Sequence, residues 1–262
     1  MKVSSKVLIA SLIFGFGKNV VANDEWQFEV SPYLWGVSQS GDTGIRNVKG
    51  SGKDLIAELD MGFSDIFKNL DSGFLINGAA RKGDWLIFAD SIYMKVKVGH
   101  SGTGFTGVGE NSISVTAREQ LMDLIAGYRT FISKVHNFYT YAGIRYADIE
   151  TSLYGDFNPI GIPELGFTRE IKFGDSWVDP IVGAYSEFKL NPSFTILTRA
   201  EIGGFGVGSD FSWLASIGVD HKLNSNWSLK YSFRYLSVDY DDNDFVFDVN
   251  TNGLLLGATY KF

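Results

Sequence analysis

Few side chains in this sequence could carry out catalysis. Its 262 residues include no cysteine and three histidines, so thiolate chemistry, disulfides and cysteine-bound zinc are excluded. Acyl hydrolysis would need a nucleophile with a positioned base, usually a serine with a histidine. His136 and His221 fall at or near tight turns, which leaves His100, beside Ser101 in a long loop, as the candidate for an enzymatic site. A loop histidine next to a serine is common by chance, so the sequence favours a protein without catalytic residues.

A second group of reactive side chains is acidic. The stretch DYDDND (239–244) places four carboxylates in an expected outer loop, those of Asp239, Asp241, Asp242 and Asp244. Clustered carboxylates can bind Ca²⁺, but the spacing is not that of an EF-hand loop, which needs its glycine and distal glutamate. The stretch therefore predicts either a cation site or a solvated loop, which divalent cations could bridge to lipopolysaccharide phosphates.

Most other charged residues alternate with apolar ones at the period of two that is typical of a β-strand. In NWSLKYSFRY (226–235), Tyr231 and Phe233 alternate with Lys230 and Arg234. The pattern predicts strands near 25–39, 73–82, 84–98, 112–132, 138–152, 176–190, 193–204, 210–223, 226–240 and 248–262. Several of these exceed the roughly five or six residues of an ordinary strand, and their length fits tilted strands that span a membrane.

Three features indicate which face of these strands is inside. Aromatic residues concentrate near strand ends, as in the interfacial girdles of membrane barrels. Tight connections such as RKGDW (81–85) and KLNSN (222–226) alternate with long ones. The chain ends on Phe262 after an amphipathic strand, which resembles the C-terminal signature that the insertion machinery of the bacterial outer membrane reads. We therefore expect the apolar faces to touch lipid and the charged faces to line an interior.

Charges of both signs then gather in the lumen. The predicted network consists of Glu29, Arg81, Asp123, Arg129, Arg145, Asp179, Glu187, Arg199, Glu201, Asp220, Lys230 and Arg234, with Lys261 beside them. Because buried charges need partners, we expect these groups to pair across a narrow, mostly filled barrel. A selective pore would normally show one dominant sign, and neither sign prevails here.

The fold class predicted is all-β, a closed antiparallel up-and-down transmembrane β-barrel of about ten strands, with twelve or eight as alternatives. With both termini and the tight turns on one side, ten strands return the chain to that side. This count requires 40–72, including the strand-like KDLIAEL (53–59), to form one outer loop or hairpin. The stretch FSDIFKNLD (63–71) could make a short turn of helix, and twelve strands would result if both 53–59 and 165–173 also spanned.

The first 22 residues have the composition of a signal peptide. Lys2 and Lys6 precede the apolar run VLIASLIFGFG, and the small residue Ala22 offers a cleavage site. The apolar run is about half the length of a spanning helix, so we expect 1–22 to be cleaved and 23–262 to form the barrel. The net charge of −7 argues against a nucleic-acid partner.

Several segments resemble a family of uncharacterised outer-membrane β-barrel proteins of Gram-negative bacteria. They are SPYLWG (31–36), FSDIFKNLD (63–71), ARKGDWLIFAD (80–90), WVDPIVGAY (177–185), GGFGVGSDFSW (203–213) and FRYLSVDYD (233–241). The resemblance covers almost the whole mature chain. It implies a single barrel in the outer membrane, and it implies no activity, substrate or catalytic residue.

The functional prediction follows from the location and the lumen. We expect a structural protein or a narrow, porin-like channel with a polar, mixed-charge lumen and no cofactor. The alternatives are an outer-rim lipid-modifying enzyme that uses His100, a lipid- or ligand-binding barrel, and a soluble periplasmic β-protein. The expected partners are outer-membrane lipids, lipopolysaccharide and, through Phe262, the insertion machinery.

Overall fold

The computed structural model describes residues 25–47, 52–103, 110–158, 167–242 and 244–262. The strands are β1 (Gln27–Ile45), β2 (Leu55–Met61), β3 (Leu70–Lys82), β4 (Trp85–Thr103), β5 (Glu110–Ile132), β6 (His136–Asn158), β7 (Phe167–Lys189), β8 (Phe194–Gly203), β9 (Phe211–Lys222), β10 (Trp227–Asp242) and β11 (Phe245–Lys261), and the helix is α1 (Phe63–Asn69). No helix in these ranges is long and apolar enough to cross a membrane.

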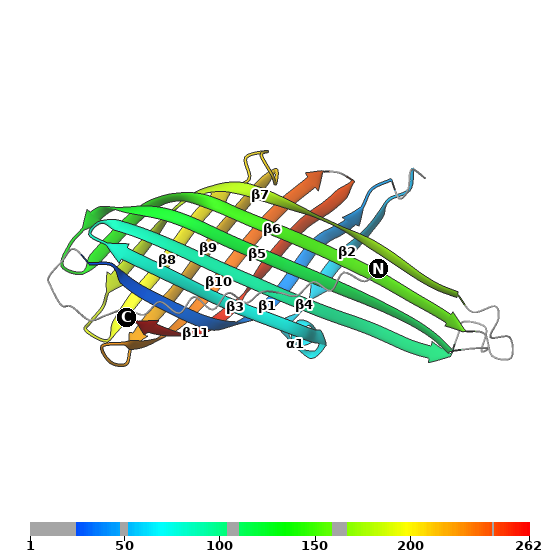
Figure 1. Cartoon of the computed structure of the whole chain (residues 1–262), viewed down its shortest axis with the longest axis horizontal. Coiled ribbons are helices and arrows are strands. Elements are labelled where there is room, and N and C mark those ends of the chain that lie inside the picture. Colours follow the sequence, from blue (N-terminus) through cyan, green and yellow to red (C-terminus); the bar gives the residue numbers. More distant parts are fainter. Residues whose placement is uncertain (1–24, 48–51, 104–109, 159–166, 243) are drawn as a thin grey trace.

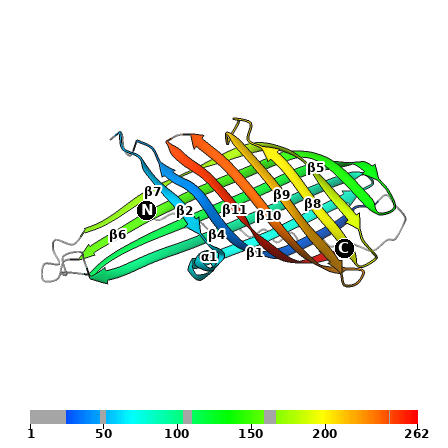
Figure 2. The ribbon, with the colours of Figure 1, turned by 180° about the vertical axis from the view of Figure 1, so that it is seen from behind.

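The strands close into a ring. Each of β3 to β11 pairs with the next strand in an antiparallel ladder, and β1 pairs with both β3 and β11 (Figures 1 and 2). Of the eleven strands in the sheet, β2 lies outside the ring, so the barrel has ten strands. The predicted closed barrel of ten strands is confirmed, and the alternatives of eight and twelve are wrong. Residues 167–173, part of the possible extra strand, form the outer end of β7.

The connections β3–β4, β5–β6, β7–β8 and β9–β10 lie at one end of the barrel, here called the turn end, together with Phe262; the opposite end is the loop end. Gly83 adopts a φ of 59° between β3 and β4, a conformation that favours glycine. The side-chain oxygens of Asn191 and Asn224 accept hydrogen bonds from backbone N–H groups two and three residues later, as in Asx turns. Local turn chemistry therefore fixes the short connections that the sequence predicts.

The first strand has two partners on one side. Its turn-end part pairs with β3 up to the Pro32–Ile76 pair, and its loop-end part pairs with β2 from the Gln39–Met61 pair. The helix α1 joins β2 to β3, and the Asp65 carboxylate accepts a hydrogen bond from the N–H of Gly62 at its start. The predicted outer hairpin and short helical turn are both confirmed.

The two faces of the wall differ in polarity as predicted near the turn end. On β10 and β11, Tyr231, Phe233 and Leu256 are 44%, 43% and 48% exposed on the outside of the barrel. Lys230 and Arg234, which alternate with them, point inward and form ion pairs. An outward apolar face combined with an inward charged face is the reverse of a soluble β-protein.

Near the loop end this polarity reverses, which the sequence prediction missed. On β10, Leu236, Val238 and Tyr240 are buried inside the barrel, whereas Asp239 is exposed outside. The three buried residues belong to a larger buried cluster, which consists of Ala147, Ile149, Trp177, Leu214, Leu236, Val238, Tyr240, Phe245, Phe247 and Val249. The molecule thus has a charged interior at one end and an apolar interior, rich in aromatic and aliphatic side chains, at the other.

Candidate functional site

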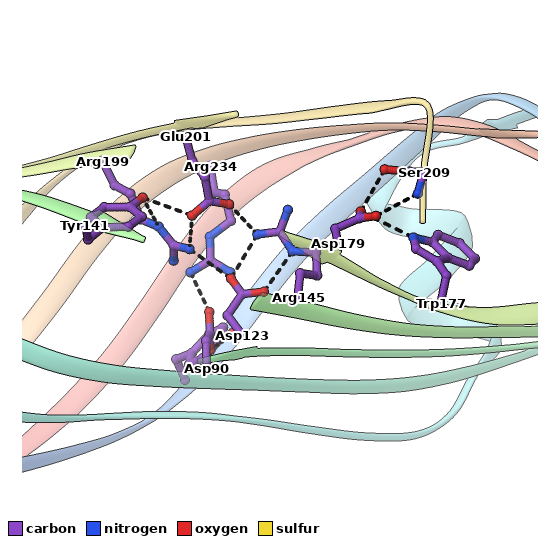
Figure 3. A network of polar contacts seen from close by, with 11 residues as sticks. Asp90, Asp123, Tyr141, Arg145, Trp177, Asp179, Arg199, Glu201, Ser209 and Arg234 are labelled. Atoms are coloured by element: carbon purple, nitrogen blue, oxygen red, sulfur yellow. Dashed lines mark hydrogen bonds and ion pairs between the residues drawn. The ribbon is translucent and has the colours of Figure 1, made fainter. Parts of the chain in front are cut away.

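The centre of the interior holds a cluster with equal numbers of positive and negative charges. Arg145 on β6 bonds to Asp123 on β5 at 2.8 Å and to Glu201 on β8 at 2.7 Å (Figure 3). Arg199, also on β8, bonds to the same two carboxylates at 2.8 and 2.6 Å. The Tyr141 hydroxyl donates to Glu201 at 2.9 Å and accepts from Arg199 Nε at 3.1 Å. Two cations and two anions are therefore matched, as burial requires.

A second ion pair crosses the barrel beside this cluster. Arg234 on β10 lies 3.0 Å from Asp90 on β4, and the Tyr33 hydroxyl of β1 donates to Asp90 at 2.8 Å. The Arg234 guanidinium also lies over the rings of Tyr33 and Trp35, at 5.7 and 5.4 Å from their centroids. We call Asp90, Asp123, Arg145, Arg199, Glu201 and Arg234 the waist.

Sequence reasoning did not include Asp90 in the lumen, because β4 carries Asp90 and Lys95 on opposite faces. The structure accounts for both residues. Asp90 points into the waist, and Lys95 lies on the outer surface nearer the loop end, where it pairs with Asp71 at 3.0 Å. A lone acidic residue in the otherwise apolar stretch WLIFADSIY (85–93) was the signal that could have found it.

Between the waist and the turn end lies a second set of ion pairs. Glu29 lies 3.0 Å from Arg81 and 2.8 Å from Lys230, and Arg81 also lies 3.1 Å from Glu187. Lys261 pairs with Asp220 at 3.3 Å. A cavity of about 130 Å³ separates these pairs from the waist. Apart from Asp179 and Arg129, the predicted lumen charges thus form two layers of ion pairs.

Two predicted lumen residues have local roles instead. Asp179 accepts hydrogen bonds from the N–H and hydroxyl of Ser209, both at 2.7 Å, and from Trp177 Nε1 at 3.3 Å. It thereby ties the glycine-rich turn between β8 and β9 to the barrel interior (Figure 3). Arg129 bonds at 2.6 Å to Asp84 in the β3–β4 turn. Neither residue is ion-paired across the lumen in the described part of the chain.

The acidic stretch at the loop end forms an ion pair on the surface. Asp241 bonds to Arg46 at 2.6 Å through a two-pronged contact, and this hydrogen bond holds the pKa of Asp241 below its ordinary range. Asp239 is exposed, Asp242 ends β10, and Asp244 has a φ of 66°. No group of three or more acidic or histidine side chains within the described ranges is arranged to hold a metal. Cation binding here stays a prediction.

Two of the three histidines, His136 and His221, have side chains that the structure describes. The His100 side chain lies outside the described residues. His136 Nε2 is 2.8 Å from Ser186 Oγ, and its ring packs against Phe131 and Phe188. The His221 ring stacks on Phe194 at 4.4 Å. The two described rings therefore take part in aromatic packing near the turn end.

Comparison with known proteins supports the fold. Neither a protein-family model nor a curated protein matches this chain. The outer membrane protease OmpT from Escherichia coli aligns with 94% of this chain and 99% of its own, at 10% identity and a TM-score of 0.53. The translocator domain of the autotransporter NalP from Neisseria meningitidis covers 90% of this chain and 88% of its own, at 11% identity and a TM-score of 0.39. The attachment invasion locus protein Ail of Yersinia pestis covers 92% and 100%, at 12% identity and a TM-score of 0.35.

At 10% identity, the likeness to OmpT shows the β-barrel fold alone. Membership in one particular family, and any activity, stay predictions. Proteolysis is a property of OmpT, and the likeness in fold does not assign it to this chain.

Proposed function

We propose that this protein is an integral outer-membrane β-barrel that is sealed at its waist, so that it serves as a structural, non-conducting barrel. The observation that carries the proposal is the burial of the waist. The side chains of Arg145, Asp123, Arg199 and Glu201 are 2%, 7%, 9% and 0% exposed. Charges that line an open aqueous pore would be wetted, whereas these are enclosed by one another.

The outer-membrane location is supported by the outward apolar face near the turn end. A spanning sheet must close on itself because lipid offers no hydrogen bonds to an open edge, and this sheet closes through β1 and β11. Trp85, Tyr128, Trp227 and Tyr260 form edge-to-face pairs on the outside near the tight turns. Aromatic side chains at this level fit the headgroup interface of a membrane. The proposal includes export by residues 1–22 and insertion aided by Phe262.

Strand length supports a barrel that spans and then projects. The 23 residues of β5 extend over roughly 75 Å at about 3.3 Å per residue, more than twice the ~30 Å hydrocarbon core. Figure 1 shows β4 to β7 running past the ends of β8 to β11. A tilted strand cannot place its whole length in lipid, so the loop end stands in the aqueous phase.

Extraction tests the location. We expect the protein to require detergent for release from membranes and to migrate differently in gels with and without heating, because a closed barrel resists unfolding by detergent. Release by salt or carbonate alone would contradict an integral barrel and favour a soluble periplasmic protein.

Planar-bilayer recording tests the seal. The wild-type barrel is expected to show no sustained conductance. The double variant Arg199→Ala/Glu201→Ala removes one cation and one anion from the waist while leaving Arg145 paired with Asp123, and it is expected to conduct.

The matched control removes an ion pair from the outer surface instead. Arg118 lies 3.0 Å from Asp148 on the outside of β5 and β6, so Arg118→Ala/Asp148→Ala should stay silent. Sustained conductance of the wild type would contradict the proposal and favour the narrow channel.

A further inference from the structure

The wall of the barrel has a gap between β2 and β4. Within the described strands, β2 pairs with β1 alone, and residues 97–103 of β4 pair only with β5. Residues 33–38 of β1 have no strand partner on the side facing β3, and α1 lies there instead. Ile66 of α1 is 3% exposed and packs against Val37 and Val96 on the two sides. The helix therefore fills the part of the gap nearer the turn end, and no described strand or helix covers the part nearer the loop end.

Behind this gap lies an apolar cavity of about 220 Å³. Its walls come from both sides of the gap and from the facing sheet, and include Leu59, Val96, Val98, Val115, Ala117 and Phe247. Val98 and Val115 are 42% and 38% exposed although they point into the barrel. A single water needs only about 10–15 Å³ of such space, so the cavity has room for an organic molecule. Its apolar lining disfavours filling by water alone.

One carboxylate in this apolar cavity, that of Glu119, has no cationic partner in the part of the chain that the structure describes. Glu119 on β5 accepts two hydrogen bonds from Gln39 Nε2, both at 2.9 Å, and both residues line the cavity. Among the described residues no lysine or arginine pairs with Glu119. Four other inward carboxylates, Glu29, Asp90, Asp123 and Glu201, each contact at least one. Gln39 is a neutral amide and leaves the charge of an ionised Glu119 uncompensated.

We propose that this cavity binds an amphiphile with an ammonium head and a single alkyl chain. The head would pair with Glu119, completing the charge balance that Glu29, Asp90, Asp123 and Glu201 find within the chain. The chain would lie along Leu59, Val96 and Val115 and would be removed from water by them. A carboxylate-headed amphiphile such as a fatty acid would be repelled by Glu119, and a neutral one would forgo the ion pair.

The gap gives such a ligand a side entrance. Lys95 and Lys97 lie on the outer face of β4 beside the gap, so this level stands above the apolar band and next to the lipid headgroups. Phe63 and Phe67 of α1 are 49% and 65% exposed just below it. An aromatic helix surface at this level is suited to the membrane interface, where amphiphiles are concentrated.

Titration calorimetry with dodecylammonium tests the proposal, using the full barrel in lipid nanodiscs and empty nanodiscs as the reference. We expect saturable binding that is about tenfold tighter than that of 1-dodecanol, the difference that one charge-assisted hydrogen bond supplies. Glu119→Gln keeps the shape and hydrogen bonding of the side chain but removes its charge, so it should bring the two affinities within about twofold. Glu119→Asp keeps the charge and should retain the preference for the ammonium head.

A matched pair of variants tests the cavity itself. Ala117→Phe fills the cavity and should abolish binding of both probes, whereas Ala126→Phe, on the outward face of the same strand, should leave both unchanged. Heat-modifiable migration reports whether each variant folds. The absence of saturable dodecylammonium binding by the wild type would overturn the proposal. An unchanged ammonium preference in folded Glu119→Gln would also overturn it. Whether the barrel conducts ions in planar bilayers, which tests the proposed function, does not change either of these two outcomes.

Discussion

The turn-end half and the loop-end half of this barrel use the same strands with opposite polarity. On β10, Tyr231 and Phe233 face outward while Arg234 is buried in the waist, and two residues later Leu236 is buried while Asp239 is exposed outside. The turn-end half is therefore apolar outside and ionic inside. The loop-end half has the reverse arrangement, as in a soluble β-protein.

In the proposed membrane barrel, the medium around each half determines which face of a strand is apolar. Lipid surrounds the turn-end half, and water surrounds the loop-end half. Where lipid surrounds the wall, apolar side chains need no burial, and the interior can hold charges that pair with one another. Where water surrounds the wall, burial of Leu236 and Phe247 stabilises the fold through the hydrophobic effect, and charges such as Arg118 and Asp148 pair on the surface. In the proposed membrane-spanning barrel, this reversal marks the outer boundary of the membrane.

The largest expected effect separates ion pairs of the two halves. Arg145→Ala leaves Asp123 and Glu201 short of a buried cation and should lower the free energy of unfolding by about 3–5 kcal/mol. Arg118→Ala breaks a surface pair of the loop-end half and should lower it by about 0–1 kcal/mol. Urea unfolding in lipid vesicles measures both values. Similar losses for the two variants would break the contrast between an ionic interior and an ionic surface.

A charge added to the outer face should be costly in one half only. Phe233→Arg places a guanidinium in the apolar band and is expected to cost about 2–4 kcal/mol if the site lies near the membrane midplane. Ser237→Arg, four residues along on the same face, is expected to cost about 0–1 kcal/mol. Folding efficiency and unfolding in vesicles provide the comparison, and equal costs would place both positions in the same surroundings.

Loss of a methyl group should destabilise the barrel more inside the loop-end half than on the outer face of the turn-end half. Ile149 is 3% exposed inside the loop-end half, and Ile144 on the same strand is 49% exposed outside the turn-end half. Ile149→Val should therefore cost about 0.5–1.5 kcal/mol, and Ile144→Val much less, because only Ile149 leaves a cavity. A larger loss at Ile144 would show that the outer face is tightly packed against something other than lipid.

The smallest expected effect concerns acid pH at the loop end. The Arg46 hydrogen bond lowers the pKa of Asp241, so the pair adds stability above the ordinary carboxyl pKa and loses it as the pH falls through the lowered value. The two side chains are 44% and 40% exposed, so solvent screens the interaction. Protection factors of amide hydrogen exchange, which are corrected for the intrinsic pH dependence of exchange, should fall slightly at the ends of β1 and β10 at low pH in the wild type. In Asp241→Asn this acid-dependent loss of protection should be absent.

The sequence predicts the barrel well because the alternation of apolar and charged residues is a local property that is repeated in every strand. The hairpin at 53–59 and the helix near 63–71 follow from parity and composition. Partners within the waist could not be predicted, because which strands face each other across the interior depends on the curvature and register of the closed sheet. Arg199 therefore joins Asp123, although 76 residues separate them.

The reversal of polarity was readable in principle. After Arg234 the apolar residues of β10 move to the even-numbered positions Leu236, Val238 and Tyr240. Interpreting the whole strand with one inside face hid this change. The gap between β2 and β4 and the role of Glu119 had no sequence signal, because they arise where β1 exchanges one partner for another.

A spin-label scan along the outer face of β10 tests the reversal most directly. Because the chain has no cysteine, single cysteine substitutions at Tyr231, Phe233, Ser237 and Asp239 can be labelled without background. In lipid vesicles, we predict that oxygen reaches labels at 231 and 233 more readily than a water-soluble nickel chelate does, and that the order reverses at 237 and 239. Equal access of the chelate to all four positions would contradict the account.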